Sequence, residues 1–165
     1  MIVKVAVTGR PGIGKTTLCM KVFKAVGDAE GFVTFEVRER GRRIGFKLHD
    51  LKSGEELWLA RVGEGYPKVG KYVVFVDSIE RFSERMKYYK GVVIIDEVGP
   101  MELKSKSFIN SMYELIESPN DLLVTVHYKS RHPLVERIKR DFKLYVIDER
   151  NRDDVAEEII KVFKK

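Results

Sequence analysis

Short apolar runs alternate with helix-like stretches over most of the chain. Residues 3–8 are largely apolar and end at Gly9, as expected for a buried strand, and the apolar positions after them recur at helical spacing until Gly27. The same alternation returns in the second half, where it predicts strands at 92–95, 122–126 and 144–147 and helices at 108–116, 133–138 and 153–163. Strands that alternate with helices predict an α/β fold, with helices on both faces of a mostly parallel sheet.

The segment between residues 32 and 76 has a different pattern. Short apolar runs follow one another there, with turn signals at Gly41 and at Ser53–Gly54 between them. Strands are expected at 32–37, 44–48, 57–62 and 72–76, before a helix at 79–86. These features predict an antiparallel β insertion, at about residues 32–76, within a single domain that spans residues 1–165.

Composition narrows the class of protein. The chain is 44% hydrophobic and 34% charged, which is typical of a globular domain. The single cysteine, Cys19, has no partner for an internal disulfide, so we expect a cytoplasmic protein. The apolar N-terminus is too short for a membrane span and runs directly into the motif at Gly9, so we expect neither a membrane anchor nor a signal peptide.

The formal net charge is +6, but lysines and arginines are interspersed with acids. Dense basic clusters occur only at residues 38–43 and 137–143, so a mixed solvated surface is the simpler interpretation and nucleic-acid binding is not excluded. Glutamine is absent while lysine and glutamate are abundant, a bias that resembles the surfaces of hyperthermophile proteins.

A phosphate-binding motif follows the first predicted strand. Residues 9–16 match G-x-x-x-x-G-K-T, whose glycines let backbone N–H groups surround phosphate oxygens. Lys15 is expected to reach the β- and γ-phosphates, and the Thr16 hydroxyl to bind Mg²⁺. The strand before the motif and the helix after it predict a three-layer P-loop NTPase fold. The expected nucleotide-binding residues are Gly9, Arg10, Pro11, Gly12, Ile13, Gly14, Lys15, Thr16 and Thr17.

Two acids follow the strand at 92–95. Asp96 is expected to hold Mg²⁺ together with Thr16, from a strand beside that of the P-loop. Glu97 is placed to orient an attacking water or take its proton, which favours hydrolysis. Residues 96–99 also fit the D-x-x-G element of GTPases, but no N-K-x-D tetrapeptide occurs, so base selectivity is expected to be weak.

Weaker candidates lie at the end of the strand at 122–126. Thr125 or His127 is a possible sensor of the γ-phosphate, because ligands bind at this edge of an open α/β sheet. Arg131, in the next loop, is a candidate for neutralising charge in the transition state. Polar strand ends and surface arginines are also common without any such role.

The motifs together resemble the THEP-type nucleoside-triphosphatases, the family of the cancer-related nucleoside-triphosphatase. The resemblance rests on residues 9–17, 31–46, 69–72, 96–103 and the histidines from 127 to 132. It implies a RecA-like strand order and hydrolysis of several ribonucleoside triphosphates. It also implies that the site rim includes Glu36, Arg38, Arg42, Arg43 and Glu102. Members often have lysine where this chain has Pro100.

Three functions remain open from the sequence. The first is slow, Mg²⁺-dependent hydrolysis of ATP, GTP, CTP and UTP by a monomer or weak oligomer, slow because no arginine is placed as a finger. The second is a nucleotide or small-molecule kinase, for which residues 36–45 would form a mobile lid. The third is an ATPase stimulated by nucleic acid, suggested by the basic balance.

Overall fold

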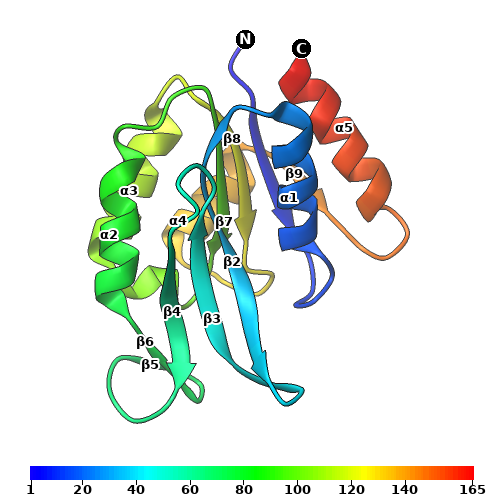
Figure 1. Cartoon of the computed structure of the whole chain (residues 1–165). Helices are drawn as coiled ribbons and strands as arrows, with labels where there is room; N and C mark the ends of the chain where they lie inside the picture. Colours follow the sequence, from blue (N-terminus) through cyan, green and yellow to red (C-terminus); the bar gives the residue numbers. More distant parts are fainter.

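The computed structural model describes residues 1–165 and contains one nine-stranded sheet, five α-helices and a short 3₁₀ helix (Figure 1). The strands are β1 (Lys4–Thr8), β2 (Ala29–Glu39), β3 (Arg42–Asp50), β4 (Glu56–Val62), β5 (Lys68–Val69), β6 (Tyr72–Val74), β7 (Val92–Val98), β8 (Asp121–Val126) and β9 (Lys143–Val146). The helices are α1 (Lys15–Val26), α2 (Val76–Met86), η1 (Glu102–Lys104), α3 (Lys106–Glu117), α4 (Pro133–Asp141) and α5 (Arg152–Lys164). The α/β class predicted from the alternating pattern is confirmed, while the two-residue β5 was not foreseen.

The strand order is β5-β6-β4-β3-β2-β7-β8-β1-β9. The pairings of β1 with β8 and β9, and of β7 with β2 and β8, are parallel, whereas the other four pairings are antiparallel. The sheet as a whole is therefore mixed. The expectation that the acidic strand lies beside the P-loop strand is wrong, because β8 pairs with both β1 and β7 and separates them.

Strand β2 belongs to both halves of the sheet. Its first residues pair in parallel with β7 as far as Phe32, which is also where its antiparallel pairing with β3 begins. Gly31 permits this change, because its φ is +132° and a Cβ there would lie 1.8 Å from the carbonyl oxygen of Ile94. The antiparallel strands thereby continue the parallel sheet rather than forming a separate one.

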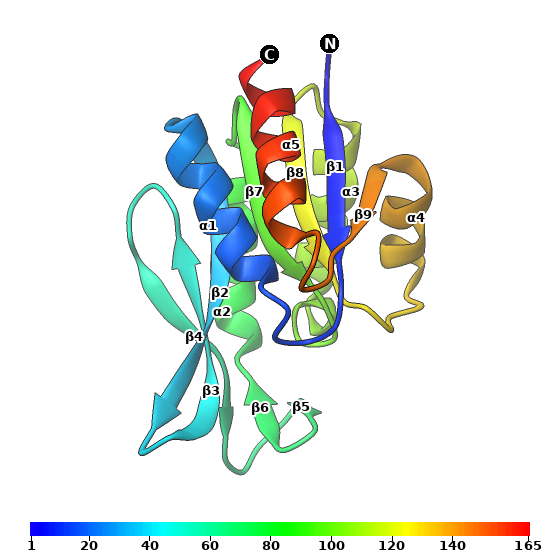
Figure 2. The ribbon, with the colours of Figure 1, turned by 90° about the vertical axis from the view of Figure 1, so that its right-hand side faces the viewer.

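Helices cover both faces of the sheet. Helices α1 and α5 pack on one face in a cluster of 15 buried residues, and α2, α3 and α4 pack on the other face in a cluster of 25. Figure 2 shows α1 and α5 in front of the parallel strands, with α3 behind them and α4 beside β9. No helix in the structure is both long enough and apolar enough to cross a membrane.

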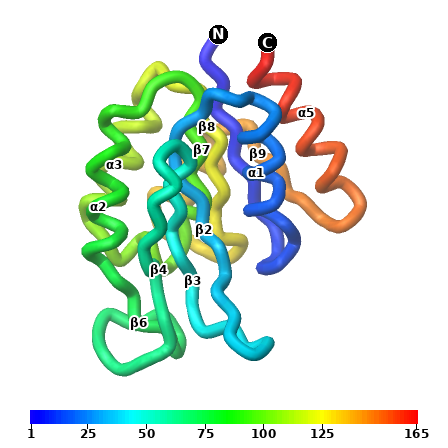
Figure 3. The backbone as a smooth tube through the Cα atoms, in the orientation of Figure 1, coloured from blue at the N-terminus to red at the C-terminus, as the bar shows by residue number.

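The loop between β1 and α1 lies at the edge where the parallel strands end. Helix α1 begins after Gly14, whose φ is +109°, and ends before Gly27, whose φ is +84°. The tube in Figure 3 shows both chain termini at the opposite end of the molecule, away from the β2–β3 hairpin. The edge that carries the phosphate motif is therefore also the edge from which the hairpin projects.

Candidate active site

The β1–α1 loop has the backbone conformation that its glycines allow. Gly12 and Gly14 have φ values of +80° and +109°, in the left-handed region. Gly9 is buried, and a Cβ there would lie 2.8 Å from the carbonyl oxygen of Ile147. The remaining candidates in the loop are exposed at Arg10, Pro11 and Thr17 and half-buried at Ile13 and Thr16. The loop thus presents its backbone to solvent at the N-terminal end of α1, where an anion is favoured.

Lys15 is held at the centre of the site. Its side chain is only 9% exposed, and its Nζ donates a hydrogen bond of 2.9 Å to the carbonyl oxygen of Gly9. The same Nζ lies 3.1 Å from Glu97 Oε2. The structure therefore joins the motif lysine directly to the second acid of β7.

Asp96 is buried and accepts hydrogen bonds from three different elements. Thr16 Oγ1 on α1 and Thr125 Oγ1 on β8 each donate over 2.6 Å, and the backbone N–H of Thr34 on β2 donates over 3.2 Å. Burial raises the pKa of Asp96, although the hydrogen bonds from Thr125 and Thr16 act in the opposite direction. The carboxylate is thus fixed next to the hydroxyl of the P-loop threonine, across the intervening strand β8.

The turn after Glu97 brings a third carboxyl group into the cluster. The backbone N–H of Gly99 donates to Glu102 Oε1 over 3.2 Å. A Cβ at Gly99 would lie 2.8 Å from Glu97 Oε1 and 3.3 Å from Glu102 Oε1, so both carboxyl groups converge on this residue. Glu102 is only 3% exposed and therefore lies beneath the site rather than on its rim, because its carboxyl group turns inward to Gly99. Burial, with a further contribution from the charge of Glu97, raises the pKa of Glu102 well above its ordinary value.

The raised pKa of Glu102 predicts a dependence of stability on pH. The folded protein binds this proton more tightly than the unfolded chain does, so the stabilising contribution is complete below the ordinary carboxyl pKa. It is lost as the pH rises through the raised pKa. Glu102→Gln, which has no such proton to lose, should therefore gain stability relative to the wild type between about pH 5 and about pH 8. Urea unfolding at both pH values checks this. The prediction would be contradicted if the difference in unfolding free energy between Glu102→Gln and the wild type did not change with pH. It would also be contradicted if the exposed control Glu84→Gln showed the same change.

The arginines expected on the rim are engaged within the hairpin. Arg43 donates to the Tyr72 hydroxyl over 3.0 Å and to Glu36 Oε1 over 3.2 Å. Arg38 donates to the same Glu36 oxygen over 3.3 Å and also to the carbonyl oxygen of Gly41. Arg42 is exposed and forms no ion pair. None of the three arginines forms a hydrogen bond or ion pair with the P-loop or Asp96. Arg38 and Arg43 are exposed and are engaged by Glu36 and other groups of the insertion instead.

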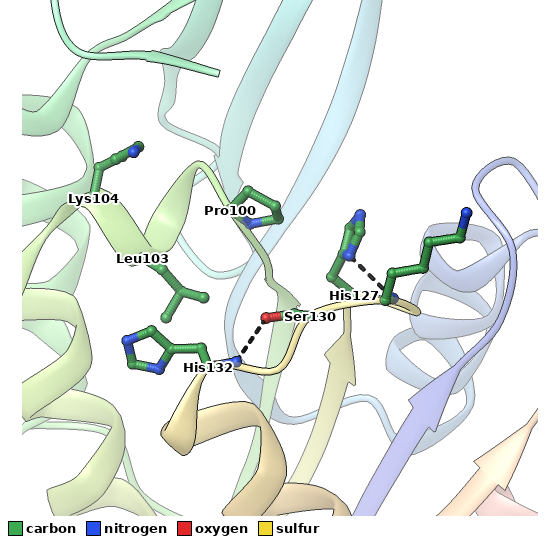
Figure 4. Close-up of a pocket in the computed structure, with 7 residues that line it drawn as sticks. Pro100, Leu103, Lys104, His127, Ser130 and His132 are labelled. Carbon is green, nitrogen blue, oxygen red and sulfur yellow. Dashed lines mark hydrogen bonds between the residues drawn. The ribbon is translucent and has the colours of Figure 1, made fainter. Parts of the chain in front are cut away.

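His127 and Arg131 lie in the connection between β8 and α4. The backbone N–H of His127 donates to the carbonyl oxygen of Val98, which keeps the ends of β7 and β8 together. The His127 side chain borders a cavity of about 410 Å³ (Figure 4), whereas Arg131 borders a neighbouring hollow of about 600 Å³. Neither side chain contacts Lys15, Asp96 or Glu97.

Two residues at the site were not foreseen from the sequence. Thr34 donates through Oγ1 to the backbone oxygen of Asp96 over 2.9 Å, besides the N–H contact described above. Arg152, the first residue of α5, donates to the carbonyl oxygen of Ile13 over 3.0 Å. Both contacts join segments far apart in the chain, so no local motif indicates them.

The chain matches a family model described as NTPase over residues 4–160. A protein named nucleoside-triphosphatase THEP1 from Archaeoglobus fulgidus is 56% identical over 164 residues, with 98% of this chain and 99% of that protein covered. A THEP1 from Methanopyrus kandleri is 42% identical over 168 residues, with 95% and 93% covered. The crystal structure of THEP1 from the hyperthermophile Aquifex aeolicus superposes with a TM-score of 0.87 at 33% identity, covering 99% of this chain and 100% of that one.

These relatives match the chain over nearly its whole length, P-loop, acidic strand and β2–β3 hairpin included. The family resemblance inferred from the motifs is thereby confirmed. The chain belongs to the THEP1 family and is a nucleoside-triphosphatase.

Proposed function

We propose that the chain hydrolyses several nucleoside 5′-triphosphates to the diphosphate and phosphate, slowly and with Mg²⁺. The observation that carries the proposal is the cluster of Lys15, Thr16, Asp96 and Glu97, joined by contacts of 2.6 and 3.1 Å at the edge of the sheet. A loop that presents backbone N–H groups to phosphate, together with an acid pair, contains the parts that phosphoanhydride hydrolysis requires.

The donor atoms at the site suit Mg²⁺. The Thr16 hydroxyl and the Asp96 carboxylate are hard oxygen ligands that already lie side by side. The structure has no group of three or more His, Cys, Asp or Glu residues that could hold a metal alone, which fits an ion that also uses substrate phosphates and water. When bound, Mg²⁺ would neutralise charge on the phosphates. Thr125 and Thr34 would keep Asp96 oriented toward it.

Glu97 is proposed to activate water. The Lys15 ammonium now lies against Glu97, and an incoming triphosphate would compete for that ammonium with three or four negative charges. Glu97 would then be released to accept a hydrogen bond from water near the γ-phosphate. The water oxygen bonds to the γ-phosphorus, the bond from that phosphorus to the β–γ bridging oxygen breaks, and the water proton passes to Glu97.

Slow turnover is proposed because no arginine contacts the reacting cluster. Lys15 and Glu97 pair with each other, and Arg38 and Arg43 of the hairpin pair with Glu36. Arg152 donates to the backbone carbonyl oxygen of Ile13 and so lies against the loop, but it forms no hydrogen bond or ion pair with Lys15, Asp96 or Glu97. An arginine placed on the transferring phosphoryl group can contribute about 10³–10⁵-fold, and this contribution would be missing.

The strand order supports a more specific description of the fold. The parallel part of the sheet runs β2-β7-β8-β1-β9, with one strand between the P-loop strand and the acidic strand, which supports a RecA-like, three-layer P-loop fold. Weak base selectivity is proposed because no guanine-reading tetrapeptide occurs.

The only cysteine, Cys19, is buried and unpaired, which supports a reducing compartment such as the cytoplasm. We also propose that the protein is a monomer or weak oligomer and that its activity does not require nucleic acid.

A panel of ATP, GTP, CTP and UTP, assayed for released phosphate with Mg²⁺ and with a chelator, tests the proposal. We expect hydrolysis of all four triphosphates with Mg²⁺ and none with the chelator, at rates well below those of arginine-assisted enzymes. Equal rates with and without metal would contradict the metal role. Turnover of tens per second by the pure monomer would contradict the claim of slow hydrolysis.

The kinase alternative is tested with γ-labelled triphosphate. Label released as free phosphate without any acceptor supports hydrolysis, whereas transfer to an added nucleotide supports a kinase. The names of the relatives and the pairing of Lys15 with a carboxylate placed to handle water both favour hydrolysis.

A further inference from the structure

A cavity of about 410 Å³ lies beside the reacting cluster and takes no part in the scheme above. It is formed by the loop after β7 and the loop after β8, and its polar lining consists of Lys104, His127, Lys129, Ser130 and His132. Its volume is within the range of about 300–1,000 Å³ that is usual for small-molecule sites. The cavity is shallow and open to solvent, so a small ligand can enter it directly from solution.

The lining of the cavity is basic. Lys104 and Lys129 are exposed and form no ion pair, although 14 ion-pair contacts occur elsewhere in the protein. No carboxylate lines the cavity. Glu102 is the acid next to it in the chain, but Glu102 is buried and its raised pKa favours the neutral form, so it opposes an anion less than an ordinary glutamate would. The chemistry of this lining selects a small anion.

The position of the cavity connects it to the reaction. Leu103 in its wall packs with the cluster formed by α2, α3 and α4, whereas Ile13 of the P-loop packs with the cluster of α1 and α5 on the opposite face. The two sides meet where β7 and β8 end, and the N–H of His127 donates there to the carbonyl oxygen of Val98. In Figure 4, Pro100 and His127 rise from this edge, while Leu103 and His132 lie to one side of it. The cavity therefore lies on the opposite side of the sheet edge from the P-loop, next to the turn that follows Asp96 and Glu97.

We propose that this cavity is an exit subsite for inorganic phosphate, which receives the anion after the β–γ bond has been cleaved. The inference rests on the proposed hydrolysis. The Lys104 and Lys129 ammonium groups would contact the phosphate oxygens, and the Ser130 hydroxyl and the histidine rings would supply further hydrogen bonds. The diphosphate would leave by the opposite, P-loop side of the edge, so that the two products separate.

Phosphate binding must be measured with the P-loop already filled, because a P-loop itself binds phosphate. The protein is saturated with Mg²⁺ and a non-hydrolysable triphosphate analogue, and inorganic phosphate is then titrated and followed by calorimetry and by amide chemical shifts. The test variant is Lys104→Ala/Lys129→Ala. The control is Lys24→Ala/Lys161→Ala, which makes the same change of charge at two exposed, unpaired lysines of α1 and α5 that do not line the cavity.

We expect phosphate to bind the filled wild-type protein and to shift amides of residues 127–132. The test variant should bind phosphate roughly tenfold or more weakly, since two charge-assisted contacts are lost, while the control keeps wild-type affinity. In multiple turnover, the test variant should resist inhibition by added phosphate, with unchanged affinity for the analogue.

Three results would overturn the proposal. The first is that no phosphate binds once the P-loop is filled. The second is that the two double variants bind phosphate with equal affinity. The third is that an oligonucleotide binds more tightly through the same lysines and displaces the phosphate. Failure of the proposed function would look different. The wild-type protein would then release no phosphate from any triphosphate, whatever the outcome of the phosphate titration.

Discussion

Glu97→Gln should lower kcat by at least about 100-fold, because glutamine keeps the size of the side chain but cannot take a proton from water. The nucleotide should bind the variant as tightly as the wild type, or more tightly. Glu97 lies 3.1 Å from the Lys15 ammonium, so its charge both repels the incoming phosphates and competes with them for that ammonium. Single-turnover hydrolysis and binding of a non-hydrolysable analogue, measured on the same preparation, separate the two effects.

Glu84→Gln on α2 is the matched control. Glu84 is exposed and forms no ion pair, so the same chemical change there should leave both kcat and affinity at wild-type values. If Glu97→Gln hydrolysed triphosphates at a near-normal rate, the role of general base would have to pass to another residue. A loss of nucleotide binding by Glu97→Gln would instead indicate a structural role for the carboxylate.

Lys15→Ala should lose both binding and turnover. Its buried Nζ is the cation that the structure places inside the loop, 2.9 Å from the carbonyl oxygen of Gly9. Removing a charge-assisted contact with phosphate should weaken binding of the analogue by at least about tenfold, and kcat should fall by about 10²–10³-fold because developing charge is no longer stabilised. Calorimetry of analogue binding and phosphate release under saturating nucleotide measure the two losses.

Lys24→Ala is the control for this variant. Lys24 lies in the last turn of the same helix, α1, and is exposed, so its removal changes the net charge equally without touching the loop. Both variants should keep the wild-type far-ultraviolet circular dichroism. If Lys15→Ala bound the analogue with wild-type affinity, the phosphate cradle would lie elsewhere in the molecule.

Local features of the chain predicted much of this architecture. The start of α1 at Lys15 and its end before Gly27 follow from glycines that take positive φ, a property of single residues. The apolar run before Asp96 identified β7 in the same way, because four consecutive hydrophobic residues favour a strand covered on both faces, and three of the four are buried. The phosphate motif and the acid pair could be found for this reason.

What the sequence missed depends on pairing between distant segments. Strand β8 separates β7 from β1, and nothing in the local pattern of any of these strands encodes that order. The same holds for Thr34, which lies 62 residues from Asp96, and for Glu102, whose burial results from a turn that directs its carboxyl group toward Gly99. The hairpin arginines were assigned to the rim by resemblance, and the engagement of Arg38 and Arg43 by Glu36 was visible only in the folded structure.

We propose that the P-loop and the acidic strand form one metal-dependent triphosphate site. The deciding experiment is calorimetric titration of a non-hydrolysable triphosphate analogue into the wild type and into Asp96→Asn, each with and without Mg²⁺. Mg²⁺ should tighten binding to the wild type at least about tenfold, and Asp96→Asn should lose this gain while it still binds the metal-free analogue. An equal gain from Mg²⁺ in both proteins, or no gain in the wild type, would contradict it.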